Sequence, residues 1–428
     1  MDREQALHAY TAVREASMAM SGPLEPEEYR LQVAEYASPV WWNLGHSSWF
    51  FAQLLREFGG EVAEEDATYG FLLNSYYAGL GDKIARDRRG SVTRPTTWEV
   101  LEYRASVDER MARLLRECPD ASWPSVWEHV TLGMQHEQQH QELFYTEIKL
   151  LRAQNPARFR IAYCDTLAPQ AGTARPAGWV RVEGGLREFG NLEGGFGWDN
   201  EYAIHQRFVP DFQMMDRLVT AGEFLEFMED GGYGNELLWL SNGWAACQTH
   251  GWSAPLYWER DGDAWNVWTL CGTRSLDSAA PVSHLSFYEA DAFANWKRRQ
   301  GGEYRHARIP TEYEWELACR QVGDPSVGNF LDSRAFQPQA CTDGPGYQLM
   351  GDAWEWTTSY YEPYPGYEPY EGFLSEYNGK FMDNQRVLRG GSCVSERNHL
   401  RPSYRNFWPA DTRFQFSGFR LVRSDGDA

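Results

Sequence analysis

The chain has 428 residues, with 40 Lys and Arg against 61 Asp and Glu, so its formal net charge is −21. Hydrophobic residues make up 42% and charged residues 24%, which excludes a largely disordered chain and predicts two or three domains with their own cores. No apolar run approaches the roughly 20 residues of a membrane span, and the acidic charge argues against binding to the phosphate backbone of nucleic acids.

The first 155 residues carry the periodicity of helices. Apolar residues recur at three- and four-residue steps in five stretches, 5–20, 27–36, 39–58, 95–117 and 126–151. In the fourth stretch, Thr96 and Glu99 have the pattern of an N-cap followed by an acidic first turn. Four of the stretches are substantial helices with short or moderate connections, which predicts an antiparallel bundle over residues 1–155.

Residues 156–178 are rich in Pro and Gly, as linkers are, and the periodicity changes after them. Short apolar stretches then alternate with turn residues, and helix patterns stand out only at 220–228 and 286–298. Aromatic residues reach 15% of the chain and concentrate after residue 178, as expected where irregular segments pack around large rings. We therefore expect an α+β multidomain protein, with a loop-rich domain over 179–428.

The seven cysteines are odd in number, scattered and without CxxC spacing. We expect reduced thiols in a cytoplasmic enzyme rather than a disulfide framework or a cysteine zinc site. The cysteines are Cys118, Cys164, Cys247, Cys271, Cys319, Cys341 and Cys393.

The sharpest local signal is the sequence HEQQH in the last predicted helix of the bundle. His136 and His140 are four residues apart, so both imidazoles face the same way and can chelate one ion. The pattern also matches the HExxH signature of zinc peptidases, with Glu137 as general base. That interpretation needs a third ligand downstream, and no further histidine appears before His205.

His46, in an aromatic stretch of an earlier helix, is the better third ligand, because metal sites in bundles use inward side chains from facing helices. Three neutral imidazoles suit Fe(II), Zn(II) or Ni(II), and the residues alone do not choose among them. Three histidines without a carboxylate leave up to three open positions on an octahedral ion, enough for two substrates and O₂.

The two halves resemble two known families. Residues 1–155 resemble the DinB-like bundle, a family with a three-histidine metal site. Residues 179–428 resemble the formylglycine-generating-enzyme/sulfatase-modifying-factor domain, an α+β fold related to C-type lectins. The motifs that carry the second resemblance lie in family order at 281–290, 308–316, 351–357 and 387–393.

In this order the two domains are similar to the ergothioneine-pathway sulfoxide synthases, and local matches occur at 73–77, 88–90, 376–382 and 404–408. The resemblance implies a non-heme Fe(II) oxidoreductase that uses O₂ to join sulfur, from cysteine or γ-glutamylcysteine, to C2 of the hercynine imidazole. In a sister branch, the selenoneine synthases, selenium comes from a selenosugar. The alternative is a DinB-type zinc-dependent thiol transferase without O₂ chemistry. Either function implies small-molecule substrates and neither nucleic acid nor membrane partners.

Two departures from the formylglycine-generating enzymes stand out. Leu400 occupies the position of a cysteine that those enzymes use, so their cysteine-oxidising activity should be absent. The loop 299–306 is longer than usual, and we expect a surface insertion because Gly, Gln and Arg are common loop residues.

The resemblance also implies roles for single residues. His46, His136 and His140 would bind the iron. Tyr76 and Tyr77 resemble a tyrosine pair that in one branch lies beside the iron and donates protons, whereas in another branch the tyrosine comes from the later domain, around 360–365. Ring packing is the alternative role for these tyrosines.

Hercynine carries a trimethylammonium group, which donates no hydrogen bond and is recognised through aromatic faces. Phe407, Trp408 and Phe416 are the candidates, unless they serve packing alone. By resemblance Asn406 would reach the hercynine carboxylate and Gln139 the imidazole.

A sulfur donor such as cysteine carries carboxylate, which arginine binds in bidentate fashion. Arg86 and Arg89 are the candidates, and an exposed basic run is the alternative interpretation.

Overall fold

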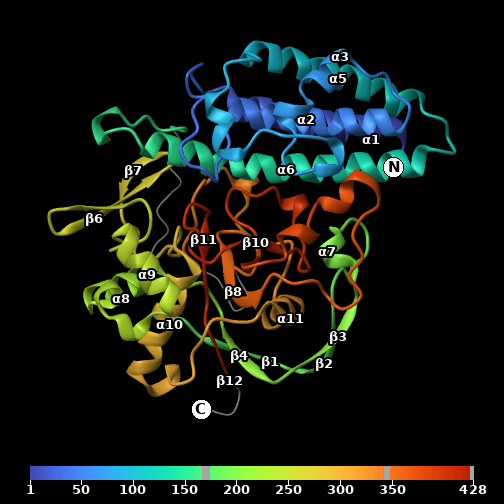
Figure 1. Ribbon diagram of the computed structural model, residues 1–428. Helices are drawn as coiled ribbons and strands as arrows, with labels where there is room; N and C mark the ends of the chain where they lie inside the picture. The colour runs from blue at the N-terminus through green and yellow to red at the C-terminus, as the bar shows by residue number, and fades with distance from the viewer. Residues whose placement is uncertain (166–173, 342–347, 425–428) are drawn as a thin grey trace. The chain divides into compact units, whose positions relative to one another are not determined.

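The computed structural model describes residues 1–165, 174–341 and 348–424. The chain divides into two compact units (Figure 1). The first comprises Met1–Arg160 and Glu371–Tyr377, and the second comprises Ile161–Tyr370 and Asn378–Ala428. Residues 371–377, which the sequence places within the later domain, thus belong by their contacts to the first unit.

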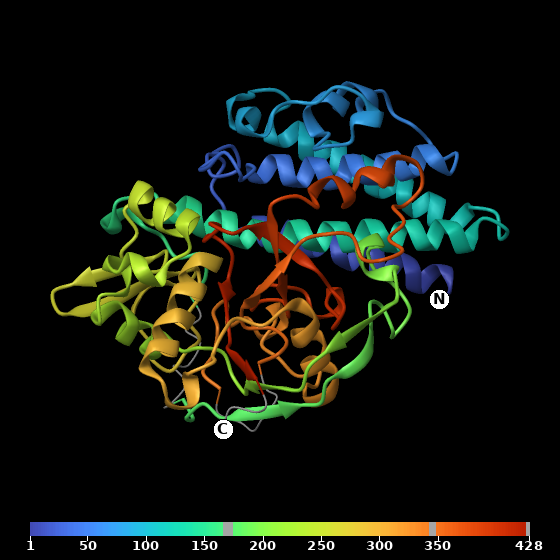
Figure 2. The same ribbon diagram turned by 60° about the horizontal axis from the view of Figure 1, so that its bottom comes forward.

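The first unit is a helical bundle. Its long helices are α1 (Arg3–Ser21), α2 (Val40–Glu57), α5 (Thr97–Glu117) and α6 (Trp123–Ala153), which lie alongside one another in Figures 1 and 2. Helices α1 and α2 each pack against both α5 and α6. The shorter elements are α3 (Glu64–Thr68), α4 (Gly70–Leu73), η1 (Ala78–Leu80), η2 (Arg86–Ser91), η3 (Ala157–Phe159) and η8 (Gly372–Glu376).

The four-helix bundle is confirmed, and α5 begins after Thr96 with the expected capping box. The helix predicted over 27–36 is wrong, because this segment forms turns and irregular chain. Side-chain hydrogen bonds hold it instead: Arg30 donates to the carbonyls of Val92 and Pro95, and Gln32 to those of Ala37 and Arg86. A ten-residue helix is marginal by itself, so these tertiary bonds decide the conformation.

The second unit is a loop-rich α+β domain whose described residues form four small sheets. The sheets have the orders β1-β4-β12, β10-β9-β8-β11, β2-β3 and β5-β6-β7. The strands are β1 (Trp179–Val182), β2 (Gly185–Phe189), β3 (His205–Val209), β4 (Phe212–Met215), β5 (Trp258–Asp261), β6 (Ala264–Thr269), β7 (Gly272–Ser275), β8 (Trp354–Tyr360), β9 (Gln385–Arg389), β10 (Asn406–Pro409), β11 (Ser417–Gly418) and β12 (Val422–Ser424).

Five α-helices and several 3₁₀ turns surround these sheets among the described residues. The helices are α7 (Asp199–Tyr202), α8 (Ala221–Glu229), α9 (Ser241–His250), α10 (Phe287–Gln300) and α11 (Glu312–Val322). The 3₁₀ turns are η4 (Gly232–Gly234), η5 (Glu236–Leu238), η6 (Gly302–Tyr304), η7 (Leu331–Ser333), η9 (Gly379–Phe381) and η10 (Arg397–His399).

The two helices predicted in this half are confirmed as α8 and α10, but α9 and α11 were missed. The sequence does carry a start signal for α11, because Thr311 and Glu314 form a capping box like those at the starts of α8 and α10. Helix α11 carries Trp315 into a fully buried cluster with residues of β1, β2 and β4. Leu400 packs against the same cluster.

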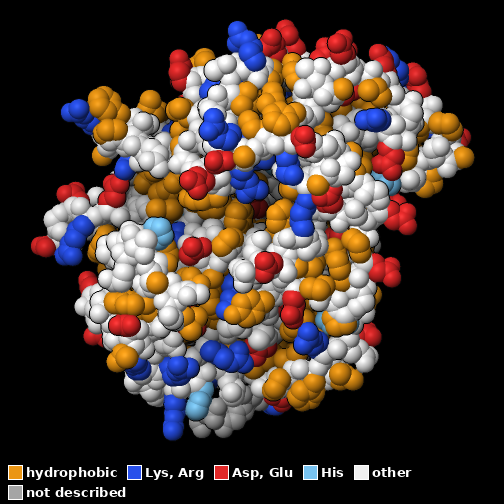
Figure 3. All heavy atoms as spheres, viewed as in Figure 1, with side chains coloured by type: hydrophobic (Ala, Val, Ile, Leu, Met, Phe, Trp, Pro, Cys, Tyr) orange, Lys and Arg blue, Asp and Glu red, His pale blue; other side chains and the backbone are white. Residues whose placement is uncertain are grey.

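The loop 299–306 lies at the surface, as expected, with Arg299, Gln300, Glu303, Arg305 and His306 exposed. Acidic and basic side chains are interspersed on the face shown in Figure 3. Within the described residues, no helix combines the length and the apolar character needed to cross a bilayer.

The expectation of seven reduced thiols is wrong for two of them. Cys164 and Cys271 form a disulfide across 107 residues of sequence, and the other five cysteines are buried and free. The backbone N–H groups of Tyr163 and Cys164 both donate to the carbonyl of Leu270, so tertiary hydrogen bonds bring the two sulfurs together. The spacing of the cysteines along the sequence does not predict such a pairing. The cytoplasmic location, which drew on reduced thiols, stays a prediction.

Gly133 offers a test of the bundle packing. A β-carbon at this position of α6 would lie 2.5 Å from Cε1 of the buried Phe51 on α2. We expect Gly133→Ala to destabilise the protein by about 1–3 kcal/mol in chemical denaturation, because overpacking outweighs the gain in helix propensity. The matched control is Gly22→Ala at the end of α1, where the backbone is helical and the nearest atom is 3.4 Å away. Equal stability of the two variants would contradict the packing described here.

Candidate metal centre

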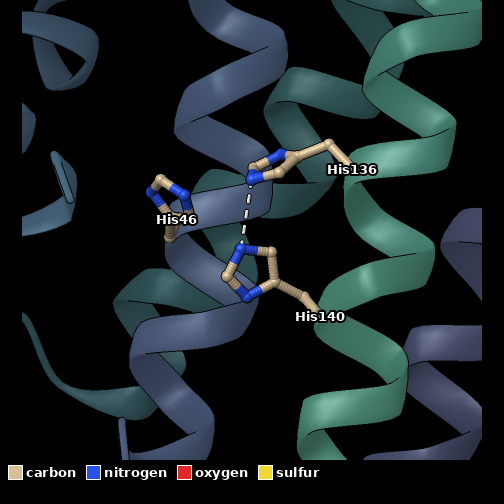
Figure 4. A group of neighbouring side chains, drawn as sticks. All are labelled: His46, His136 and His140. Carbon is tan, nitrogen blue, oxygen red and sulfur yellow. Dashed lines mark hydrogen bonds between the residues drawn. The ribbon is translucent and has the colours of Figure 1, made fainter. Parts of the chain in front are cut away.

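Three histidines converge inside the first unit. His46 comes from α2, and His136 and His140 lie one turn apart on α6, so that their side chains point toward a common centre (Figure 4). The ring nitrogens available as ligands all lie within 4.8 Å of one another. Among the described residues, no other group of three His, Cys, Asp or Glu side chains is close enough to hold one ion.

In two of the three rings, hydrogen bonds determine which nitrogen is free to bind a metal ion. Nδ1 of His46 lies 2.6 Å from the carbonyl oxygen of Leu73, which can only accept, so Nδ1 carries the proton. Nδ1 of His140 lies 3.0 Å from Oδ1 of Asn43, whose Nδ2 donates to Glu147 at 2.6 Å. His140 therefore also carries its proton on Nδ1. In both rings the lone pair of Nε2 is left for a ligand.

The histidines are held neutral. His46 and His136 are 1% and 2% exposed, and burial lowers the pKa of both well below the usual range of histidine. Burial also lowers the pKa of His140 to about 4. Metal binding requires unprotonated nitrogen, so at neutral pH the three rings are in the state that a divalent ion needs.

The spacing fits one ion. Nε2 of His140 lies 3.1 Å from Nε2 of His136, so a proton or a cation must lie between them (Figure 4). Two nitrogens about 2.1 Å from one ion, at right angles to each other, lie about 3.0 Å apart. The donor set therefore fits a divalent transition metal with further positions open to small molecules.

Glu137, the general base of the peptidase interpretation, is engaged elsewhere. Its carboxylate pairs with Arg14 at 2.7 Å and Arg104 at 2.5 Å and accepts from Ser17 at 2.5 Å. Burial alone would raise the pKa of Glu137, but the two guanidinium groups lower it to about 2. This carboxylate is the counter-charge of two buried arginines, which leaves the peptidase interpretation without its base.

Of the two arginines proposed to bind a donor carboxylate, Arg86 is exposed and Arg89 is buried. The Arg89 guanidinium lies 3.4 Å from the ring centroid of Trp42, and Trp42 stacks on His46 with centroids 4.6 Å apart. Burial and the neighbouring Arg86 lower the pKa of Arg89 to about 9. Within the described part of the chain no carboxylate lies at ion-pair distance from Arg89, so this cation stands beside the histidines without an anionic partner.

Tyr77 is fully buried, and its ring packs against Trp49 and Phe373. Burial and the adjacent Tyr76 raise the pKa of Tyr77 well above the ordinary value, which keeps its hydroxyl protonated. Tyr76 is half-buried, and its ring centroid lies 6.1 Å from that of Tyr377.

Tyr377 is a site residue that the sequence reasoning missed, although it lies in the segment 376–382 that resembles the sulfoxide synthases. Its ring centroid lies 5.7 Å from that of His136, and its hydroxyl donates to Oε1 of Gln139. The neighbouring Glu376 accepts from the backbone N–H groups of Ala78 and Gly79 at 3.0 and 2.8 Å. These bonds fasten the segment Glu371–Tyr377 to the bundle.

The residues expected to bind hercynine, apart from Gln139, belong to the second unit. Asn406, Phe407 and Trp408 are half-buried on β10. The Phe407 ring stacks on Tyr361 with centroids 4.0 Å apart, and Oδ1 of Asn406 accepts from the backbone N–H of Phe407 at 2.9 Å. This edge of the unit presents a stacked aromatic surface beside an amide.

Two other residues of the second unit face inward. Phe416 is 1% exposed and packs against His284. Tyr364 lies in the segment 360–365, the other candidate source of the proton-donating tyrosine, and it is buried. Its hydroxyl donates to Glu312 at 3.0 Å and accepts from Arg389 at 2.8 Å. Both side chains serve the interior of the domain in the described structure.

Comparison with known proteins gives two domain matches. Residues 165–344 and 345–425 match the sulfatase-modifying factor enzyme 1-like domain, and residues 9–144 match the DinB superfamily. The two matches account for nearly all of the chain.

Curated relatives agree with these matches. The chain is 35% identical over 250 residues to a hercynine oxygenase of Mycobacterium tuberculosis, covering 52% of this chain and 55% of the relative. A hercynine oxygenase of Mycolicibacterium smegmatis is 35% identical over 251 residues, with the same coverage. Ergothioneine biosynthesis protein 1 of Schizosaccharomyces pombe is 27% identical over 239 residues, 54% of this chain and 28% of the relative. The matched parts thus span about half the length of the hercynine oxygenases.

Glu137 gives a test of its structural role. We expect Glu137→Gln to lower the free energy of unfolding at pH 7 by about 3–5 kcal/mol, because among the described residues it leaves the buried Arg104 without an anionic partner and Arg14 with Asp108 alone. Since the pKa of Glu137 falls from 4.5 to about 2 on folding, its stabilisation is present above pH 4.5 and is lost as the pH falls toward 2. The stability difference between wild type and variant should therefore shrink over that window. Chemical denaturation at several pH values measures it, and a variant as stable as the wild type at pH 7 would exclude this role.

Proposed function

This chain belongs to the sulfatase-modifying factor enzyme 1-like family and carries a DinB-superfamily domain before it, and from that premise we propose that it is a non-heme iron enzyme of ergothioneine or selenoneine biosynthesis. In this proposal Fe(II) and O₂ serve to join the sulfur of cysteine or γ-glutamylcysteine, or the selenium of a selenosugar, to C2 of the hercynine imidazole. The observation that carries it is the convergence of three neutral imidazoles in a chain similar to hercynine oxygenases.

The proposed reaction balances without another reductant. Hercynine loses its C2 hydrogen and the thiol or selenol loses its proton as the new bond forms, and the chalcogen takes one oxygen atom of O₂. The second oxygen atom leaves as water with the two hydrogens. The four electrons accepted by O₂ come from forming the C–S or C–Se bond and from oxidising the chalcogen.

His46, His136 and His140 would hold the iron, which when bound would supply redox chemistry with O₂ and favour the deprotonated thiol. The stack of Trp42 on His46 and the hydrogen bonds at Nδ1 orient these ligands before any substrate enters. Holding the chalcogen and the ring carbon at reacting distance is the chief contribution expected of such a site.

Gln139 would hydrogen-bond the hercynine imidazole, and Tyr377, which donates to it, would hold its amide in place. Asn406 would bind the hercynine carboxylate, with the faces of Phe407 and Trp408 toward the trimethylammonium group. Phe416, the third aromatic candidate, is buried and packs against His284.

Water formation consumes protons, and tyrosines near the histidines are the candidates to deliver them. Tyr76 and Tyr77 keep this role in the proposal. Burial keeps Tyr77 protonated at neutral pH, so it is a donor and not a base. The ring of Tyr377 contacts the rings of His136 and Tyr76. It therefore connects the pair Tyr76 and Tyr77 with the metal ligands.

Catalysis by iron and O₂ has a direct test. Purified protein loaded with Fe(II) should convert hercynine and a competing mixture of γ-glutamylcysteine, cysteine and a selenosugar, in air, into one sulfoxide or selenoxide, identified by mass spectrometry. His140→Ala should lose about 10³-fold or more of this activity, since one ligand is gone. His250→Ala, at an exposed position of α9, is the matched control and should keep full activity.

The same experiment separates the zinc-dependent thiol transferase. A transferase would turn over without O₂ and with Zn(II) in place of Fe(II), whereas the proposed enzyme would stop when either is withheld. Full anaerobic activity would reject the proposal.

The unpaired Arg89 predicts the chemistry of the donor. If its guanidinium binds a donor carboxylate, Arg89→Met should raise KM for cysteine or γ-glutamylcysteine about 10- to 100-fold, the effect of one charged hydrogen bond of about 1.5–3 kcal/mol. Arg88→Met removes the same charge at an exposed position of η2 and should change KM less than about threefold. Initial rates over a range of donor concentrations measure both, and equal effects of the two variants would show that Arg89 does not bind the donor.

A further inference from the structure

A continuous path of hydrogen bonds runs inside the first unit from Arg89 to His140. Nη1 of Arg89 donates to Oγ of Ser38 at 2.8 Å, and the backbone N–H of Ser38 donates to Oε1 of Glu147 at 2.8 Å. Oε2 of Glu147 accepts from Nδ2 of Asn43 at 2.6 Å, and Oδ1 of Asn43 accepts from Nδ1 of His140 at 3.0 Å. Glu147 stands at the middle of this path.

Glu147 is an unusual residue for the interior of a bundle. It lies seven residues after His140 on α6, so it shares that face of the helix, and it is only 6% exposed. In the described structure it makes no ion pair, and its two oxygens are satisfied by N–H donors alone. Burial raises the pKa of Glu147 to about 7. A buried acid without a cation destabilises a fold, so its presence calls for a role beyond packing.

The amide of Asn43 is the link whose direction matters. An amide can turn over and exchange its oxygen with its nitrogen, whereas the backbone carbonyl that binds His46 cannot. If Nδ2 of Asn43 faced His140, Nδ1 of that ring would have to accept, and its proton would move to Nε2, where it blocks the metal-binding lone pair. A carboxylate at Glu147 only accepts, so it holds Nδ2 on its own side and Oδ1 toward His140.

We propose that Glu147 is a positioning residue that, through Asn43, fixes the proton of His140 on Nδ1 and so sets the metal affinity of the three-histidine centre. The inference rests on the metal centre of the proposed function and deepens it. In this inference Asn43 and Glu147, which are not ligands themselves, keep His140 in the tautomer that binds a metal. Hydrogen-bonding partners of metal-bound histidines have this role in general.

Co(II) titration of the full chain tests the inference without any turnover. Glu147→Gln keeps the shape of the side chain but adds an N–H donor, which allows Asn43 to turn over. We expect its Co(II) affinity to fall about 10- to 100-fold, with a changed visible absorption spectrum. Asn43→Leu, which removes the acceptor of His140, should give a similar loss. Asp66→Asn, at a buried carboxylate that pairs with Arg110, controls for loss of a buried acid and should keep the wild-type affinity.

The double variant Asn43→Asp/Glu147→Gln is the decisive measurement. It exchanges the amide and the carboxylate, so Asp at position 43 can accept from both neighbours while Gln at position 147 accepts from the N–H of Ser38. Every hydrogen bond of the path is restored, with the direction reversed only between positions 43 and 147, and Co(II) affinity should return to within about threefold of the wild type. Thermal unfolding by circular dichroism shows that the variants are folded.

Wild-type affinity in Glu147→Gln, or failure of the double variant to recover, would overturn the inference while leaving the metal centre intact. Absence of stoichiometric Co(II) binding by the unmodified chain would instead overturn the metal centre of the proposed function, and this inference with it.

Discussion

The candidate site of the first unit depends on three neutral imidazoles, two of them buried and one half-buried, whose nitrogens face a common point. Nε2 of His136 and Nε2 of His140 lie 3.1 Å apart, and two unprotonated nitrogens at that distance repel each other unless a proton or a cation lies between them. Burial keeps the rings neutral, so the protein itself supplies no charge to relieve this contact. A neutral His136 can donate from Nε2 to His140, or one ion bound to both nitrogens can replace that hydrogen bond. The fold therefore holds the two rings where a divalent ion would take the place of a proton.

The charges around the histidines are arranged in two distinct ways. On one side Glu137 pairs with Arg14 and Arg104, and Arg14 pairs also with Asp108, so these buried charges belong to the scaffold. On the other side Arg89 and Glu147 are buried and form no ion pair among the described residues, and each is hydrogen-bonded to Ser38. In the first cluster the opposite charges meet each other. In the proposals made above, the second would leave a cation to meet an anionic substrate and a carboxylate to orient a metal ligand, so function is expected where the charges are unpaired.

Sequence reasoning reached what is encoded locally. Helical periodicity predicted the bundle, and the spacing of HEQQH predicted that His136 and His140 lie on the same face of one helix. Both predictions follow from 3.6 residues per turn. It missed Asn43 and Glu147, since their roles depend on contacts across 104 residues of sequence. Sequence reasoning also failed to predict the Cys164–Cys271 disulfide and the irregular chain at 27–36, because tertiary hydrogen bonds, and not the local pattern, determine them.

The contribution of residues 371–377 shows why the two domain matches do not by themselves describe the site. The DinB match covers residues 9–144, yet the bundle completes its interior with a segment that follows more than 200 residues later. Phe373 covers Tyr77, and Tyr377 holds the amide of Gln139 next to His136. Without that segment Gln139 loses the donor that orients it. The first unit therefore includes a segment from the later half of the chain that the DinB match does not cover.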